Sequence, residues 1–246
     1  MLEAGNKKTP AGRDSSGMQS GGRRINKRVS LSSSQREEVR KLRVQCGQLC
    51  VAVFLEEQSA VRSLGFTSSI DGEGKSFLAR LAAEVTAADH ALPVTLLECN
   101  WEHPCFEETF KLEQGPGLAE WVRGECELEE IRQPVSSNLT VIRAGDDKGE
   151  TIRLLQRLRQ RGALDVLERP GEVLIADLPS IMTTAYGTLA ASIVESLIVV
   201  VRMGVTADSD VAETCMRLKD LHVQGVVLNQ VNSRIPRWLD PSLRSG

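Results

Sequence analysis

The sequence contains no long hydrophobic run. Its most apolar stretch, residues 197–201 with their neighbours, is only as long as a strand, whereas a membrane-spanning helix needs about 20 apolar residues. The first residues also lack the apolar segment that marks a secretory signal. These absences argue against a helical membrane protein, and we expect a cytoplasmic one.

Paired cysteines and zinc-binding patterns are missing as well. None of the six cysteines forms a CxxC pair, and in a reducing compartment isolated thiols are expected to be small buried side chains. Cys99, His103 and Cys105 lie close in sequence, but their spacing matches no usual zinc site. Tyrosine is nearly absent too, since Tyr186 is the only one in the chain. A fold stabilised by disulfides or zinc is therefore not expected.

Positive charge is concentrated at the N-terminus. Residues 1–36 hold eight Lys or Arg and two Asp or Glu, a net charge of +6, and the rest of the chain carries −9, which together give −3. Because this segment has few large apolar side chains, we expect residues 1–34 to be a disordered basic arm. Such an arm either contacts anionic lipid at the inner face of the membrane or acts as a solubilising tail.

The strongest local signal is a glycine-rich loop. Residues 67–76 read Thr-Ser-Ser-Ile-Asp-Gly-Glu-Gly-Lys-Ser, follow the apolar residues 61–66, and lead into helix-forming residues that begin at Lys75. A strand, a loop ending in Gly-Lys-Ser and a helix together are typical of a phosphate-binding P-loop. Ser69 replaces the first glycine of the usual pattern, which leaves an ordinary glycine-rich turn as the alternative.

The parts of this loop have physical roles in binding ATP or ADP with Mg²⁺. Gly72 and Gly74 allow backbone N–H groups to point at phosphate oxygens, and the positive end of the helix faces the same oxygens. Lys75 would lie near the β- and γ-phosphates, and the hydroxyl of Ser76 would reach Mg²⁺. The predicted nucleotide-binding residues of the loop are Ser69, Asp71, Gly72, Glu73, Gly74, Lys75, Ser76 and Phe77.

Strand-like and helical segments alternate along the chain. We expect helices at residues 35–55, 117–122, 150–168 and 207–221 besides the one after the loop, and strands at 94–97, 139–142, 173–176, 195–202 and 223–228. Strands so rich in Val, Ile and Leu predict an α/β fold, a single P-loop NTPase domain with a mostly parallel central sheet and helices on both faces. We place this domain at residues 35–232, with the most apolar strand at its centre and a tail at 233–246.

Four polar signals fall at the carboxyl ends of the expected strands. They are the glycine-rich loop, the segment from Glu98 to Asn100, Asp177 and Asn229. Ligands of parallel α/β sheets bind at this edge. The convergence predicts one nucleotide site to which all four contribute.

These motifs together resemble the cytoplasmic ATPase domain of the bacterial capsular and exopolysaccharide tyrosine kinases, which are deviant-Walker P-loop ATPases. The resemblance extends over about residues 35–232. Thr67-Ser68 and residues 72–76 match the family's loop, in which Asp71 takes the place of a proline. Residues 177–180, Asp-Leu-Pro-Ser, resemble the family's Walker B ending Asp-x-Pro-Pro, and Asn229 resembles its adenine-contacting asparagine.

The second Walker motif departs from the family pattern Asp-x-Asp-x-Arg-x-Pro. Residues 98–104 read Glu-Cys-Asn-Trp-Glu-His-Pro and keep only the proline. The resemblance implies that Lys75, Glu98 and Asp177 are catalytic and that Ser76, Glu98 and Asp177 hold Mg²⁺. Asn100 stands where the family has its candidate base, and an amide cannot accept the proton. We therefore expect reduced kinase chemistry, and the tyrosine-free tail excludes autophosphorylation there.

A further motif of the family lies on the first expected helix. Glu37, Arg40 and Arg43 fit Glu-x-x-Arg-x-x-Arg, which the family uses for ring assembly; a surface helix with i,i+3 salt bridges is the alternative. The resemblance implies two partners, further copies of this chain and the cytosolic segment of a membrane polysaccharide chain-length regulator. No nucleic-acid partner is expected.

Three functions remain open from the sequence. The first is an ATP-binding P-loop protein that regulates polysaccharide polymerisation or export, as an ATPase or tyrosine-kinase-like phosphotransferase. The second is a nucleotide-binding regulatory subunit without significant catalysis. The third is a spatial ATPase of the partition or septum type. ATP turnover with and without a regulator segment separates the first two, and dependence of turnover on lipid or DNA favours the third.

Overall fold

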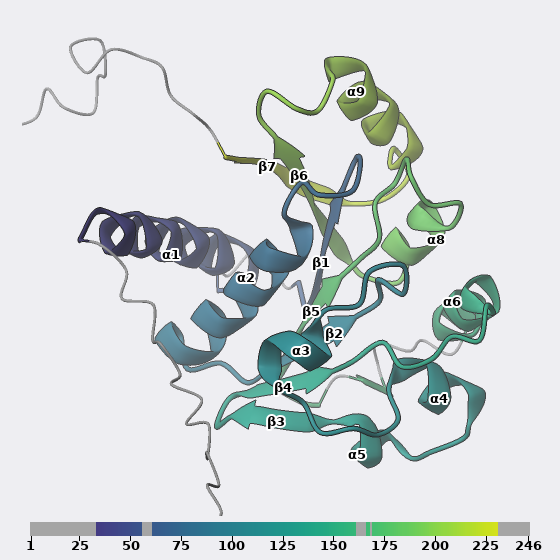
Figure 1. Cartoon of the computed structure of the whole chain (residues 1–246). Helices are drawn as coiled ribbons and strands as arrows, with labels where there is room; N and C mark the ends of the chain where they lie inside the picture. Colours follow the sequence, from purple (N-terminus) through teal and green to yellow (C-terminus); the bar gives the residue numbers. More distant parts are fainter. Residues whose placement is uncertain (1–32, 56–60, 161–165, 168, 231–246) are drawn as a thin grey trace, which may run out of the picture.

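The computed structural model describes residues 33–55, 61–160, 166–167 and 169–230 (Figure 1). The helices are α1 (Ser33–Phe54), α2 (Lys75–Asp89), α3 (Phe106–Phe110), α4 (Leu118–Arg123), α5 (Leu128–Ile131), α6 (Thr151–Gln160), α8 (Gly187–Ala191) and α9 (Asp208–Arg217). The strands are β1 (Ser63–Ser68), β2 (Val94–Glu98), β3 (Gln133–Ser136), β4 (Leu139–Ile142), β5 (Val173–Asp177), β6 (Ser196–Arg202) and β7 (Val223–Asn229). The predictions for the basic arm and for the tail lie outside the described residues.

The described strands form one sheet in the order β3-β4-β2-β5-β1-β6-β7. Neighbouring strands are parallel, except that β3 and β4 are antiparallel. This arrangement confirms the predicted single α/β P-loop NTPase domain. One detail is corrected, because β6 lies next to the edge strand β7 and not at the centre, although nearly all of its residues are buried.

Helices cover both faces of the sheet, as the apolar strands require. Successive strand residues alternate between two cores. Leu96 and Ile175 pack on the side of α1 and α2, whereas Leu97 and Leu174 pack on the side of α4, α6 and α8. Figure 1 shows these two groups of helices on opposite sides of the sheet. Because the strands from β4 to β7 in the sheet order are parallel, their carboxyl ends lie at one edge of the sheet.

Helix α1 packs along α2. Its buried residues Cys46, Cys50 and Val53 contact that helix and the sheet behind it, and the Cys50 thiol lies 3.8 Å from the carbonyl oxygen of Ala82. Cys99 is buried as well, but Cys215 is exposed on α9, so the expectation of buried cysteines holds for only part of the set. In the buried positions the thiol serves as a small apolar side chain.

Candidate nucleotide site

The glycine-rich loop joins the carboxyl end of β1 to the first turn of α2, as predicted. Gly72 and Gly74 have φ angles of 80° and 97°, a region that side chains other than glycine rarely adopt. At Gly74 the restriction is doubled, because a Cβ atom there would lie 2.3 Å from Nδ2 of Asn229. That same Nδ2 donates a hydrogen bond to the carbonyl oxygen of Glu73 at 2.8 Å. The end of β7 is thus fixed directly against the loop.

Glu73 holds the loop in this shape from within. Its side chain is buried, and Oε2 accepts a hydrogen bond from the backbone N–H of Ile70 at 2.8 Å. Oε1 accepts one from the N–H of Arg202 at 3.0 Å and another from the hydroxyl of Thr206. The carboxylate therefore connects the loop to the end of β6. Its role is to hold the shape of the loop.

Lys75 has its ammonium group inside the site and an acidic neighbour beside it. The side chain is only 6% exposed, and Nζ lies 3.7 Å from Oδ1 of Asp71. The carboxylate of Asp71 also accepts hydrogen bonds from Ser180 Oγ at 2.8 Å and from Thr183 Oγ1 at 2.9 Å. Although partial burial acts in the opposite direction, these hydroxyls and the lysine lower the pKa of Asp71.

Glu98 and Asp177 are neighbours in the register of β2 and β5, at the ends of their strands. Both are buried, but the oxygens of Glu98 are engaged by the backbone. Oε1 accepts from the N–H groups of Cys105 and Phe106 at 2.5 and 2.8 Å, and Oε2 from that of Ala144 at 3.1 Å. Burial raises the pKa of Glu98, and these three amides act against the increase.

Asp177 has the opposite surroundings. Neither of its oxygens has a hydrogen bond of normal geometry among the described residues. Complete burial raises the pKa of this carboxyl to about 7, against the opposing effects of Lys75 and of the Ser76 hydroxyl. Asn100 is equally buried, and neither its Oδ1 nor its Nδ2 has a partner in the described part of the chain. Since buried polar groups are nearly always hydrogen-bonded, these two side chains mark a place for a polar ligand.

The remaining predicted loop residues lie at the same edge of the sheet. Ser76 is partly buried in the first turn of α2, and Phe77 is 44% exposed with the guanidinium of Arg80 over its ring. Ser69 is buried, and its hydroxyl accepts a hydrogen bond from Thr214 of α9 at 3.0 Å. The structure therefore brings together the four polar signals that the sequence places at strand ends.

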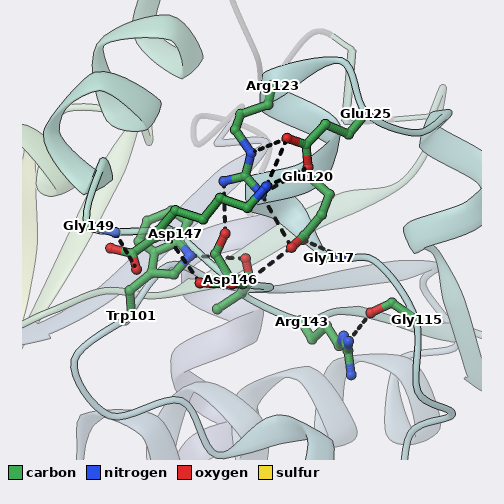
Figure 2. Close-up of polar contacts among 12 residues, drawn as sticks. Trp101, Gly115, Gly117, Glu120, Arg123, Glu125, Arg143, Asp146, Asp147 and Gly149 are labelled. Atoms are coloured by element: carbon green, nitrogen blue, oxygen red, sulfur yellow. Dashed lines mark hydrogen bonds and ion pairs between the residues drawn. The ribbon is translucent and has the colours of Figure 1, made fainter.

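A polar network that the sequence analysis did not single out supports this edge (Figure 2). Glu120 of α4 accepts hydrogen bonds from the N–H groups of Gly117 and Asp146, at 2.8 and 3.0 Å. Arg123 donates to the carbonyl oxygen of Asp146 at 2.8 Å, which fastens the segment after β4 onto α4. That segment includes Ala144, one of the residues that bind Glu98. The glycines at positions 117 and 145 are the sequence signal for this network. The two backbones approach so closely that a Cβ atom on Gly117 would lie 2.5 Å from the nitrogen of Gly145.

The three residues of the α1 motif lie apart from the nucleotide edge. Arg40 and Glu37 form an i,i+3 ion pair at 3.7 Å, and Arg43 binds both carboxylate oxygens of Asp89, at the C-terminal end of α2, at 3.1 Å. These contacts all lie within one chain, which is what the alternative interpretation, a surface helix with salt bridges, predicts. The assembly role of the motif stays a prediction.

The sheet order, the glycine loop and the strand-end residues define the class, a P-loop ATPase domain fold. Among solved structures the chain is similar to the kinase domain of the Escherichia coli tyrosine kinase ETK, with a TM-score of 0.70 and 24% identity over 82% of this chain and 78% of that one. It is also similar to the VpsO kinase domain, with a TM-score of 0.66 and 21% identity over 80% and 99%. The chain thus has the fold of the bacterial tyrosine kinase domains.

A third similar structure extends the likeness beyond the kinases. The septum site-determining protein MinD of Pyrococcus horikoshii, solved with Mg-ADP, matches with a TM-score of 0.58 and 17% identity over 70% of this chain and 71% of that one. No protein-family model and no curated protein matches the sequence. Among the described residues, no helix has the length and apolar character needed to cross a membrane.

Proposed function

We propose that the protein is a P-loop ATPase that binds ATP or ADP with Mg²⁺, and that it is a divergent member of the capsular exopolysaccharide tyrosine kinase family. One observation carries the proposal: the carboxylate of Asp177 is fully buried, accepts no hydrogen bond of normal geometry among the described residues, and is influenced by Lys75 and Ser76 of a glycine-rich loop. The fold it shares with ETK, VpsO and MinD supports the assignment, and MinD was solved with Mg-ADP.

The chain's own residues have distinct roles in this proposal. The N–H groups of the loop and the N-terminus of α2 bind the phosphates, and Lys75 neutralises their charge. Ser76 and Asp177 would hold Mg²⁺, which when bound stabilises charge on the transferring phosphoryl group. Glu98 would act on the metal only through water, because its oxygens are hydrogen-bonded to the backbone. Asn229 would contact the adenine, as the resemblance implies.

The test of nucleotide binding is calorimetric titration of the native chain and of Lys75→Met with MgADP and MgATP. Lys75→Met should lose most of the affinity, about a hundredfold, because a charge-assisted contact to the phosphates disappears. Lys219→Met is the matched control, since Lys219 is exposed in the turn after α9. Equal affinity of the native chain and Lys75→Met would contradict the proposal.

The proposed partner is the cytosolic segment of a membrane polysaccharide chain-length regulator. A synthetic peptide of this segment should raise the ATP turnover of the native chain, while a chain that binds MgATP with no turnover in either condition would be a regulatory subunit. Anionic vesicles test the membrane contact proposed for residues 1–36, which lie almost wholly outside the described residues. Turnover that depends on lipid or DNA in place of the peptide would favour a spatial ATPase.

Self-association through α1 is the second part of the proposal. If Arg40 and Arg43 pair with acidic groups of a neighbouring copy, the contact is head-to-tail and closes into a ring. Replacing both arginines with Ala should leave smaller species in light scattering with MgATP. Asp89→Asn is the informative control, because it frees Arg43 from its partner in the same chain and should preserve assembly. A native chain that stays monomeric at high concentration would contradict this part.

A further inference from the structure

Asp71 is an acidic side chain in the middle of a loop that is expected to bind anions. Its carboxylate lies 3.7 Å from Nζ of Lys75, and 3.9 Å from Nε2 of His103 on the segment after β2. The hydroxyls of Ser180 and Thr183, both from the segment after β5, hold it in place at 2.8 and 2.9 Å. Four contacts from three segments therefore position one negative charge next to the lysine.

The position of this charge relative to a bound nucleotide follows from the loop. In a P-loop the backbone N–H groups and the helix N-terminus surround the α- and β-phosphates, and the lysine reaches the β- and γ-phosphates. Asp71 belongs to this loop, and its carboxylate contacts the ammonium group of Lys75 as well as the segments that follow β5 and β2. Because the lysine that would reach the terminal phosphate is also the one that Asp71 contacts, the terminal phosphate of a triphosphate would come near this carboxylate.

We infer that Asp71 is a specificity-determining residue whose carboxylate competes with the terminal phosphate of ATP for Lys75, so that the site favours MgADP over MgATP. This inference rests on the nucleotide binding proposed above. Two like charges about 4 Å apart repel each other strongly wherever water is partly excluded. A diphosphate keeps its contacts with the loop and does not extend as far toward the carboxylate, so it is affected less. In the free protein the carboxylate neutralises Lys75 and keeps the loop closed onto the segment after β5.

The experiment compares the affinities of the full chain and of Asp71→Asn for MgATP and MgADP by calorimetric titration. Asparagine carries no charge; its oxygen can accept from one of the two hydroxyls, Ser180 or Thr183, and its NH2 group can donate to the oxygen of the other. Its affinity for MgATP should rise about tenfold and its affinity for MgADP by much less. Asp220→Asn is the matched control, because Asp220 is exposed in the turn before β7, at the opposite edge of the sheet.

Each outcome decides the inference. The inference is supported if Asp71→Asn gains more affinity for MgATP than for MgADP while Asp220→Asn shows no change. It is also supported if Asp71→Asn binds MgATP and the native chain does not. If the native chain binds nucleotide and Asp71→Asn binds MgATP equally or more weakly, the inference is overturned while the proposed function stands. If neither binds any nucleotide, both fail. Asp71→Ala gives the same comparison should the asparagine variant not fold, as judged by circular dichroism.

Discussion

The ends of β2 and β5 lie side by side and carry the same kind of group in opposite conditions. Glu98 and Asp177 are register partners, both buried and both acidic. The segments after β2 and β4 bring three backbone N–H groups to Glu98. Asp177 receives no such group from the described residues. The backbone of the described residues therefore donates hydrogen bonds to one carboxylate and none to the other.

This difference shows that two acidic side chains at neighbouring strand ends can have different surroundings and therefore different energetics. The three amide partners of Glu98 favour its anionic form against the larger effect of burial, which raises its pKa, and they tie the carboxylate to the segments around it. A buried carboxylate without partners is costly in the free protein, and a cation can compensate that cost. This comparison supports the proposed roles, in which Glu98 shapes the segments around it and Asp177 holds Mg²⁺.

The largest expected effect comes from adding a carboxylate at Asn100, a buried position two residues after Glu98. Asn100→Asp should raise phosphate transfer to a tyrosine-bearing peptide about 10²-fold, because general-base assistance contributes at least that much. The measurement is transfer of labelled phosphate from ATP, with Asn100→Asp in the Lys75→Met background as the blank. A native chain that already phosphorylates tyrosine at ordinary kinase rates would show that another carboxylate serves as base.

Removing the charge of Glu98 tests its architectural role. Glu98→Gln places an NH2 group against backbone N–H donors and loses a charged acceptor, so the free energy of unfolding should fall by about 2–3 kcal/mol. Asp177→Asn, the isosteric change at the neighbouring strand end, should leave stability unchanged or increase it. Urea denaturation of the two variants without nucleotide measures both. Equal losses of stability in the two variants would contradict the conclusion that only Glu98 has a structural role.

The pH dependence of stability sharpens the comparison with a smaller effect. The pKa of Asp177 is raised to about 7 in the folded state, above that of an exposed aspartate, so the folded chain binds more protons than the unfolded chain below pH 7. Stability from this group is therefore present at low pH and is lost as the pH rises toward 7. Near pH 5–6 this group should lower the free energy of unfolding by about 1 kcal/mol for each unit by which the pH rises.

Asp177→Asn isolates this contribution, because the difference between native and variant cancels the other titrating groups. The free energy of unfolding, measured from pH 5 to 8 in the absence of Mg²⁺, should fall more steeply with pH in the native chain. If the free energy of unfolding changes with pH in the same way in both proteins, the pKa of Asp177 is not raised by folding. Its burial would then have no effect on the pH dependence of stability.

Much of the fold was predictable from the sequence, because the elements that dominate it have long periodic patterns. The helix after Lys75 and the strand at residues 139–142 were placed correctly, since buried strands rich in Val, Ile and Leu leave little ambiguity. The strand β3 was missed because it contains Pro134 and is mostly exposed. The predicted helix at residues 207–221 ends at Arg217, where the chain turns before β7 although no glycine or proline marks the end.

The residues of the candidate site were predictable from the sequence, but their hydrogen bonding was not. Strand-end positions fix that Glu98 and Asp177 come together, yet hydrogen bonds from segments 7 to 46 residues away decide which of them is satisfied. The two hydroxyl partners of Asp71 lie more than 100 residues further along the chain. Such contacts depend on loop conformation, for which the sequence contains no periodic signal.

The packing of α1 along α2 has a consequence for how signals can pass through the molecule. Helix α2 begins at Lys75 and ends at Asp89, the partner of Arg43, so a single rigid rod joins the phosphate end to the proposed assembly motif. If nucleotide binding shifts this rod, the affinity between copies changes, and thermodynamic reciprocity requires that assembly change nucleotide affinity by the same factor. A concentration-dependent affinity for MgADP would be the signature of that linkage.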